Sequence, residues 1–459
     1  MKILLLKPFN KSDHIQPSLG LGYLAESVRR DHEVMILDCI KDKISVDKLE
    51  GVLKRCRPDV LGMQCYTFDL NFIDAALVSA KAFDKNIVTV TGGPHPSAAA
   101  AEMMDMFRGR LDFAFSGEAE IGFPKLLDCL KNGGRNFDGV PGLMWREGAV
   151  LKSNPKTVSE DLDNIPMPAW DLIRPETYPE SQHGAFFKQF PIAPIMITRG
   201  CPYPCTFCAG GTVSGKKVRH RSIDNVLKEL IYLNKERGIK EFHVIDDNFT
   251  MDMGYAKEFL RRLKALNLGM TWAVPNGVRM DALDDELLKL MKETGLYMIS
   301  LGIESGSDKV LRDMKKSLTI SKIKECVKRI NDGGIDVSGF FILGFPGETE
   351  ESIRDTIRLS LELKLVRANF FTYLPFPGSE SYERLRAENK LKGIDWNNFY
   401  FMTASYAPDG MTRARLKNLQ RFAFARFYLR PRIIAYNIMS IQSFRHFLFL
   451  FKRFFRWLA

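Results

Sequence analysis

Residues 192–208 read IAPIMITRGCPYPCTFC. This stretch predicts a strand over Pro194–Thr198 that runs directly into a loop with three cysteines, Cys201, Cys205 and Cys208, spaced C-x3-C-x2-C. Thiolates bind soft metals and iron–sulfur clusters, and closely spaced cysteines can reach different irons of one cube. Three ligands instead of four leave one iron open for a substrate, as the open position does in catalytic zinc sites. We therefore expect an iron–sulfur cluster at this loop.

Two other interpretations of the cysteine loop stay open: a structural zinc site and three unrelated thiols. Zinc would need a fourth ligand such as His220, and the paired cysteines of common zinc motifs are missing. The remaining cysteines are scattered, at Cys39, Cys56, Cys65, Cys129 and Cys326. Because the N-terminus carries no export signal, we expect buried thiols in a reducing compartment and a cytoplasmic protein.

Strands and helices alternate along the chain that follows the loop. Strands are predicted at Pro194–Thr198, Glu241–Ile245, Thr271–Val274, Met298–Ile303, Val337–Leu343 and Ala368–Tyr373. Helices are predicted at Ile223–Arg237, Tyr255–Ala265, Asp284–Glu293, Ile320–Asp332 and Glu350–Leu363. Six strands with intervening helices predict a partial parallel (β/α)6 barrel, with its chemistry at the carboxyl ends of the strands.

The first 130 residues show the same alternation and predict a doubly wound, Rossmann-type α/β domain. Strands are predicted at Lys2–Leu6, Glu33–Asp38, Val60–Tyr66, Ile87–Thr91 and Leu111–Phe115. Helices are predicted near Leu21–Arg30, Val46–Arg55, Phe72–Phe83, Ala98–Phe107 and Phe123–Leu130. Five strands fit the flavodoxin-like arrangement, whose ligand lies outside the carboxyl ends of the strands. Turns rich in Gly and Pro fall at those ends, in residues 17–22, 92–96 and 116–118.

A hairpin over Gly142–Lys152 and a proline-containing linker are predicted to join the two halves. The prolines disfavour helix, so we expect extended chain over 163–170. The predicted domains are residues 1–140, a hairpin and linker over 141–190, a barrel over 191–385 and a helical C-terminal region over 386–459.

The net charge of +11 originates in the C-terminal tail. Residues 410–459 hold eleven Lys and Arg and no Asp or Glu; subtracting these from 66 leaves 55 basic residues, which balance the 55 acidic ones. On a helix, Arg445, Lys452 and Arg456 share one side and phenylalanines cover much of the rest. This pattern is typical of an interfacial helix drawn to anionic lipid. A helix packed on the barrel is the alternative, and we expect no nucleic acid because apolar residues dominate.

The cysteine loop resembles the signature of radical SAM enzymes, which bind S-adenosylmethionine (SAM) at a 4Fe-4S cluster and cleave it to a 5′-deoxyadenosyl radical. The resemblance continues through the strand ends and implies that Cys201, Cys205 and Cys208 are metal ligands. It also implies that residues of the later strand ends contact SAM, namely Asp246, Asp247, Arg279, Glu304, Ser305, Gly344 and Pro346. Five of them have a structural alternative: a helix cap for the aspartates, an ion pair for Arg279 and a tight turn for Gly344 and Pro346.

A flavodoxin-like domain before such a barrel resembles the cobalamin (B12)-binding subfamily of radical SAM enzymes, over residues 1–385. The resemblance implies that the cobalamin-contacting residues are Gly20, Gly92, Gly93, His95, Gly117 and Glu118. Glycines let the backbone approach a bulky cofactor closely. The Asp-x-His-x-x-Gly motif of many cobalamin proteins is absent from the sequence. We therefore expect no histidine ligand to cobalt from this chain; a degenerate domain without cofactor is the alternative.

These features give three hypotheses for the function. The first is a cobalamin-dependent radical SAM methyltransferase that methylates an unactivated carbon of a lipid, isoprenoid or tetrapyrrole, with an electron donor such as flavodoxin or ferredoxin. In the second, the radical step ends in cyclisation, oxidation or carbon–carbon coupling. In the third, the chain is a cobalamin- or membrane-binding module with an inactive barrel.

Overall fold

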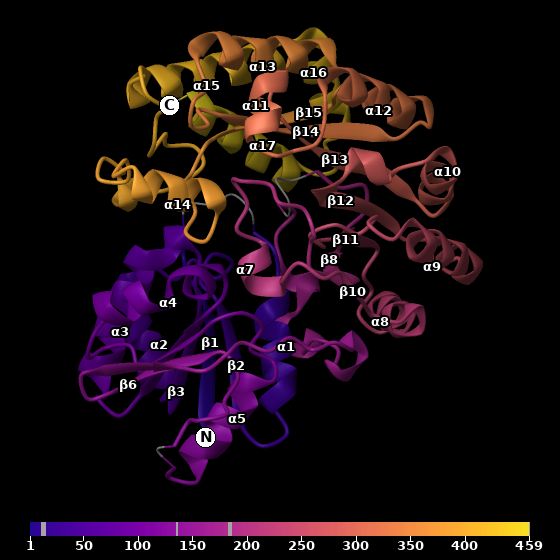
Figure 1. Cartoon of the computed structure of the whole chain (residues 1–459). Helices are drawn as coiled ribbons and strands as arrows, with labels where there is room; N and C mark the ends of the chain where they lie inside the picture. The colour runs from indigo at the N-terminus through magenta and orange to yellow at the C-terminus, as the bar shows by residue number, and fades with distance from the viewer. Residues whose placement is uncertain (11–14, 135, 182–185, 459) are drawn as a thin grey trace.

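The computed structural model describes residues 1–10, 15–134, 136–181 and 186–458. Two parallel sheets dominate the fold, one in each half of the chain. In Figure 1 the first sheet and its helices, in indigo and purple, lie below the second sheet and its helices, in magenta to yellow.

The first sheet has the flavodoxin-like strand order. Its parallel strands are β1 (Lys2–Lys7), β2 (Glu33–Asp38), β3 (Val60–Gln64), β4 (Val88–Gly92) and β5 (Phe113–Phe115), in the order β2-β1-β3-β4-β5. Its helices are α1 (Leu19–Val28), α2 (Val46–Cys56), α3 (Leu70–Phe83), α4 (Pro94–Met106) and α5 (Gly122–Lys131), with the 3-10 turn η1 (Thr67–Asp69) before α3. Because side chains alternate along a strand, Leu4 and Leu6 pack against α2, α3 and α4, whereas Ile3 and Leu5 pack against α1 and α5. The predicted doubly wound sheet is confirmed.

The hairpin β6 (Leu143–Glu147) and β7 (Val150–Ser153) extends the first sheet, with β6 antiparallel to β5. The chain then crosses to the second sheet through η2 (Leu162–Asn164), α6 (Trp170–Ile173) and η3 (Pro175–Thr177). Our expectation of extended chain holds only for residues 166–169. The reason is that Trp170 starts a helical turn and is buried, with its Nε1 donating to Glu229 Oε1 at 2.9 Å.

The second sheet is six-stranded and parallel, as predicted. Its strands are β8 (Ile192–Ile195), β11 (Glu241–Val244), β12 (Thr271–Val278), β13 (Leu296–Glu304), β14 (Asp336–Leu343) and β15 (Arg367–Thr372), in sequential order. Its helices are α8 (Ile223–Lys235), α9 (Met253–Leu266), α10 (Asp285–Glu293), α11 (Asp308–Asp313), α12 (Ile320–Asp332) and α13 (Glu350–Glu362), with η5 (Met280–Ala282) before α10. The cysteine loop leaves β9 (Thr198–Arg199), which pairs with β10 (Arg219–His220), and α7 (Gly211–Ser214) lies between them.

The C-terminal region is helical, with α14 (Glu380–Ala387), η6 (Trp396–Asn398), α15 (Arg413–Tyr428), α16 (Pro431–Met439) and α17 (Phe444–Leu458). The side chains of Phe424 and Phe427 on α15 pack edge-on against Phe370 of β15, at ring distances of 5.4 and 6.2 Å. Helix α15 therefore covers the last strand. Within the described residues, no helix combines the length and apolar character needed to cross a membrane.

Candidate active site

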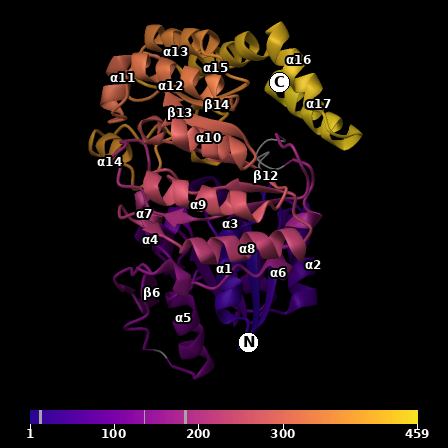
Figure 2. The same cartoon turned by 90° about the vertical axis from the view of Figure 1, so that its right-hand side faces the viewer.

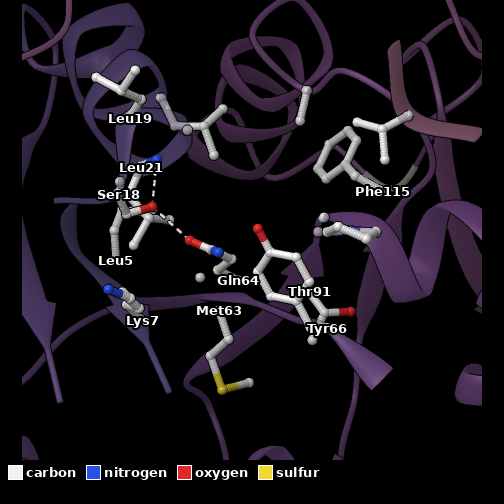
Figure 3. A pocket seen from close by; sticks show the side chains of 18 of the residues that line it. Leu5, Lys7, Ser18, Leu19, Leu21, Met63, Gln64, Tyr66, Thr91 and Phe115 are labelled. Atoms are coloured by element: carbon white, nitrogen blue, oxygen red, sulfur yellow. Dashed lines mark hydrogen bonds between the residues drawn. The ribbon is translucent and has the colours of Figure 1, made fainter. Parts of the chain in front are cut away.

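A cavity of about 500 Å³ lies between the carboxyl ends of the two sheets. Figure 3 shows the side of it that the first sheet and α1 form. One side of it comes from the first sheet and includes the predicted residues Gly20, Gly92, Gly93, Gly117 and Glu118. The other side comes from the second half of the chain and includes Met196, Arg199, Val213, Ser214, Ile245 and Phe401. The cavity therefore joins the first sheet to the start of the barrel.

The inner part of this cavity is apolar and depends on glycines. Leu5, Leu21, Val90 and Phe115 line it together with Gly62. A Cβ at Gly62 would lie 2.8 Å from Leu5 Cδ2, so a larger residue there would push Leu5 into the space. A slot that keeps backbone accessible and side chains small suits the long tail of a nucleotide-bearing cofactor.

A hydrogen bond across the cavity wall sets the start of α1. Ser18 Oγ caps the helix by accepting from Leu21 N at 3.4 Å, and it donates to Gln64 Oε1 of β3 at 2.5 Å (Figure 3). Gly20 follows in the first turn, and a Cβ there would have no atom within 4 Å. The first turn of α1 thus faces open space in the cavity, and contact of Gly20 with a cofactor stays a prediction.

His95 does not line the cavity, whereas the nearby Gly92 and Gly93 do. It lies in the first turn of α4, and its Nδ1 is 3.1 Å from Thr67 Oγ1. Burial lowers the pKa of His95 to about 4, so the imidazole is neutral at physiological pH. The structure gives His95 a hydrogen bond with Thr67, and its contact with a cofactor stays a prediction.

The cysteine loop is held at both ends by backbone contacts. Gly200 has φ +95°, and a Cβ there would lie 2.2 Å from the Lys217 carbonyl oxygen, so only glycine fits. Thr206 N donates to Met314 O at 3.0 Å, and Thr206 O accepts from Ser381 N at 2.8 Å. Three elements distant in sequence therefore fix the loop.

The thiols themselves remain accessible on this fixed loop. Cys201 and Cys205 are half-buried and Cys208 is exposed, while Gly210 N donates to Cys208 Sγ at 3.3 Å. In the described part of the chain, no three His, Cys, Asp or Glu side chains converge on one metal-ion position. A four-iron cube does not need such convergence, because each thiolate binds a different iron. The donor set and the N–H···S bond fit a cluster.

The two aspartates after β11 have different environments. Asp246 is 2% exposed and accepts from Ile197 N, Thr198 N and Thr198 Oγ1, at 2.8, 2.7 and 2.8 Å. Burial raises its pKa to about 7 against these hydrogen bonds. Asp246 thus braces the chain before the cysteine loop. Asp247 is exposed; desolvation raises the pKa of its carboxyl, and the Gly200 N–H is close enough to oppose that rise. A Cβ at Gly210 would lie 3.8 Å from Asp247 Oδ1, so the carboxylate borders the loop.

Arg279 also supports the cysteine loop through its own contacts. Its guanidinium lies 3.8 Å from the centre of the Tyr203 ring, and its Nε and Nη2 donate to Asp281 at 3.0 and 2.8 Å. The remaining Nη1 donates to Lys316 O at 2.8 Å. Of the two interpretations from sequence, the structure therefore shows the ion pair.

The end of β13 carries a buried ion pair. Glu304 has φ +62° and its Oε1 accepts from Lys316 Nζ at 2.7 Å, with both side chains largely buried. The absence of a side chain at Gly302 makes this possible, since a Cβ there would lie 2.4 Å from Glu304 Oε1. Lys316 Nζ is also 5.7 Å from the Phe207 ring of the cysteine loop. Sequence reasoning missed Lys316.

Three other predicted SAM residues have structural contacts. Ser305 is buried, with its Oγ 3.2 Å from Thr356 Oγ1. Gly344 has φ +82°, and a Cβ there would meet Leu416 of α15 at 2.5 Å, so this turn brings α15 close. Pro346 is half-buried in the same turn. The turn is held by Glu348, which the sequence did not single out: its Oε2 accepts from Gly344 N at 2.6 Å and from Phe345 N at 3.1 Å.

A buried ion-pair network joins the first sheet to the cysteine loop. Glu118 pairs with Arg219 at 2.5 Å and lies 3.4 Å from Arg199, while Glu120 pairs with Arg199 at 2.7 Å. The two glutamates follow β5, and the arginines belong to the β9–β10 hairpin. The resemblance implied that Glu118 contacts a cofactor, but no local pattern indicated its arginine partners, because they lie far away along the chain.

A flavodoxin-like sheet whose cavity reaches Arg199, directly before the thiol-bearing loop of a six-stranded parallel sheet, is the arrangement expected of a cofactor-dependent α/β enzyme. Residues 195–360 match the Radical SAM superfamily and residues 9–127 match the B12 binding domain. The chain is 31% identical to an uncharacterized methyltransferase of Pyrococcus horikoshii, over 99% of this chain and 97% of the relative. It therefore belongs to the B12-binding radical SAM enzymes, and its cofactors are a 4Fe-4S cluster, SAM and cobalamin, as predicted.

Two other relatives and one solved structure also match over most of the chain. The chain is 32% identical to cytidylyl-2-hydroxyethylphosphonate methyltransferase of Streptomyces wedmorensis, over 83% of this chain and 80% of that one. It is 25% identical to anaerobic magnesium-protoporphyrin IX monomethyl ester cyclase of Rubrivivax gelatinosus, over 98% and 81%. The fold matches the methyltransferase TsrM of Kitasatospora setae with cobalamin and cluster bound, at TM-score 0.71 and 18% identity, over 96% and 91%.

Proposed function

We propose that this radical SAM enzyme is a methyltransferase that methylates an unactivated carbon of a hydrophobic substrate. The observation that carries the proposal is the shared cavity, which Gly92 and Gly93 line from one sheet and Met196 and Arg199 from the other. A group bound against the first sheet would face the mouth of the barrel. Two relatives that cover most of the chain, from P. horikoshii and S. wedmorensis, are methyltransferases, which supports methyl transfer.

Individual residues take roles that follow from their contacts. Cys201, Cys205 and Cys208 would bind the cluster, and the exposed Asp247 beside them is the best candidate for SAM. When bound, the cluster supplies the electron that cleaves SAM, and cobalamin carries the methyl group. The Asp246 carboxylate already accepts hydrogen bonds from Ile197 and Thr198. We therefore propose that Asp246 positions the loop without touching a cofactor.

The other site residues predicted from sequence also fall into two groups: residues that would contact a cofactor and residues that shape the barrel mouth. Gly20, Gly92, Gly93 and Gly117 would contact cobalamin, because each lines the cavity. Arg279, Glu304, Ser305, Gly344 and Pro346 are instead proposed to shape the barrel mouth through the contacts described above.

A line of aromatic rings supports a hydrophobic substrate. Phe340 of β14 stacks on Phe371 of β15 at 5.9 Å, and Phe371 lies 5.1 Å from Phe401. The line continues to Phe68 at 6.3 Å and to Tyr66 at 5.2 Å. The last three of these rings line the cavity.

The two strand aromatics face the inside of the barrel. Their chain neighbours Phe341 and Phe370 are fully buried against the outer helices, so by alternation Phe340 and Phe371 point the opposite way, where both are half-buried. Half-buried rings at a cavity can stack on a ring or an isoprenoid chain. A lipid, isoprenoid or tetrapyrrole would use such a wall. The substrate class of the proposal rests on it.

An electron donor and a compartment complete the proposal. SAM cleavage needs one electron per turnover, which a flavodoxin or ferredoxin would deliver. None of the eight cysteines is paired in a disulfide, which suits the reducing cytoplasm.

The test is the product pattern of the anaerobically reconstituted protein. With SAM and dithionite, the wild type should form S-adenosylhomocysteine and 5′-deoxyadenosine together, measured by mass spectrometry. Cys201→Ala should abolish deoxyadenosine, whereas Cys56→Ala, at the end of α2, should leave it unchanged. Deoxyadenosine without S-adenosylhomocysteine would overturn methyl transfer and favour the cyclisation chemistry of the R. gelatinosus relative.

The substrate class has a separate test. Incubation with methyl-deuterated SAM and fractionated cell extract should place label in the organic-soluble fraction. Label confined to the aqueous fraction would overturn the hydrophobic substrate and leave methyl transfer intact.

A further inference from the structure

Helix α17 presents apolar side chains to solvent. Phe444, Phe447, Leu448 and Phe451 are 73, 40, 37 and 50% exposed. Their spacing of three and four residues puts them on one side of the helix. Rings of Phe444 and Phe447 lie 6.3 Å apart, and those of Phe447 and Phe451 lie 5.8 Å apart, so the side is continuous. A surface helix of a globular protein normally turns such a side inward.

Contacts on the opposite side of α17 fix this orientation. His446 is fully buried, its ring lies 4.7 Å from that of Phe187, and its Nδ1 accepts from Gln442 N at 3.1 Å. Ser443 Oγ donates to the Glu180 carboxylate. The helix is therefore docked on the chain between the two sheets by the side that carries His446, where Phe449 and Leu450 are half-buried. The other side, with its four exposed apolar residues, faces outward as a consequence.

Helix α16 adds to the exposed apolar surface. Ile434, Ile438 and Met439 are 42, 62 and 76% exposed. They precede α17 directly in the chain, and Figure 2 shows both helices, in yellow, at one edge of the molecule. We call the seven side chains of α16 and α17 named here the tail face. Exposed apolar surface of this kind marks a site of contact with a partner or a membrane.

The positive charge beside the tail face indicates which kind of partner it binds. Arg445 and Lys452 are exposed and seven residues apart, so they share the flank of α17. No acidic residue occurs between Gly410 and Ala459. A second copy of this chain would bring like charges together at a symmetric interface, which is unfavourable. An anionic bilayer offers both an apolar interior for the phenylalanines and negative headgroups for the basic flank.

We propose that the tail face docks the enzyme onto the surface of an anionic lipid bilayer, with α17 lying in the plane of the interface. The apolar side chains enter the boundary between headgroups and acyl chains, and Arg445 and Lys452 pair with lipid phosphates. The proposal does not depend on methyl transfer, since it rests only on the exposed side chains of α16 and α17 and on the charge beside them.

Flotation of the full-length, reconstituted protein with vesicles tests the proposal. The protein should float with vesicles of phosphatidylglycerol and phosphatidylcholine in equal parts, and much less with pure phosphatidylcholine. The double variant Phe447→Ser/Phe451→Ser should weaken binding at least about tenfold, because two buried rings are lost. Met106→Ser, an exposed apolar residue on α4, is the matched control and should bind like the wild type.

A second double variant, which changes only exposed charges, tests the proposal even if the serine variant does not fold. Arg445→Glu/Lys452→Glu retains every apolar side chain and should lose the preference for anionic vesicles. Failure of the wild type to float, or flotation unaffected by both double variants, would overturn the proposal. A dimer in size-exclusion chromatography that the serine variant dissociates, without vesicle binding, would assign the face to a second copy instead.

Discussion

Replacing Glu118 with glutamine tests whether the ion pairs between the two sheets hold the cysteine loop in place. Arg219 Nη2 and Nη1 donate to the Glu118 carboxylate at 2.5 and 3.0 Å, and Arg199 Nη1 lies 3.4 Å from Glu118 Oε1. Arg199 stands directly before Gly200 and the first cysteine. The substitution removes one charge and keeps the size of the side chain. We expect it to lower both the stability of the protein and the iron content after reconstitution.

The magnitude follows from burial and charge balance. The network holds two carboxylates and two guanidinium groups, and no side chain in it is more than 11% exposed. Removing one carboxylate leaves a buried positive charge without a partner, which costs about 3–5 kcal/mol. An exposed pair such as Glu325 and Arg329 contributes only about 0–1 kcal/mol. Glu118→Gln should therefore destabilise far more than Glu325→Gln.

Urea unfolding followed by tryptophan fluorescence measures the difference. The series is wild type, Glu118→Gln, Arg219→Met, the double variant and the control Glu325→Gln. Because the double variant removes both charges of one pair, it should cost less than the sum of the single variants, by about 0.5–3 kcal/mol. Iron content of the same samples reports whether the cysteine loop is affected.

Three results would each refute a part of this reasoning. A loss below about 1 kcal/mol in Glu118→Gln would mean that the charge is not buried in solution. Additive single variants would mean that Glu118 and Arg219 do not interact. Normal iron content in a clearly destabilised variant would separate the network from the cysteine loop.

Three further substitutions test other parts of the site. Gly200→Ala should cost about 1–3 kcal/mol and sharply reduce iron content, because a Cβ there meets the Lys217 carbonyl at 2.2 Å with φ at +95°. Gly20→Leu should reduce bound cobalamin, read from its absorption spectrum, and leave iron content unchanged, because the side chain would enter open space in the cavity. Glu348→Gln should flatten the pH dependence of stability, measured by urea midpoints. Burial raises the pKa of Glu348 to about 8, so the native carboxyl stays protonated while the unfolded chain ionises, and stability falls by up to about 1.4 kcal/mol per pH unit as pH rises from about 4.5 to about 8.

One result would contradict each of these three expectations. Full iron content in Gly200→Ala would show that the loop can adopt another backbone path. Equal amounts of bound cobalamin in Gly20→Leu and wild type would mean that the cofactor does not bind beside α1. A wild-type slope retained by Glu348→Gln would mean that Glu348 is ionised in the native state, despite its burial.

Hydrophobic alternation in the sequence predicted the strands of both parallel sheets, although it missed the helical turns of the linker between them. Apolar runs bounded by Gly and Pro predicted eleven parallel strands, and all eleven are present with shifted ends. The same alternation put the turns 17–22 and 92–96 at the carboxyl ends of the first sheet, where the cavity lies. Local patterns succeed here because burial on both faces of a parallel sheet requires continuous apolar runs.

The roles of single polar residues could not be predicted in this way. Asp246, Arg279 and Glu304 were expected at the barrel mouth and are there, yet each is engaged with protein groups. A strand position tells which end of the sheet a residue reaches, but not which donor or acceptor faces it. Glu118 and Arg219 are 101 residues apart, and nothing local marks them as a pair.

By itself, the sequence determined that three thiols follow a buried strand, that a flavodoxin-like domain precedes them and that a basic, phenylalanine-rich helix ends the chain. Only the tertiary structure decided that the two sheets share one cavity and that α17 turns its apolar side to solvent. The physical reason is the same in both cases. Periodicity fixes which side chains share a face, whereas contacts such as that of His446 with Phe187 decide where the face points.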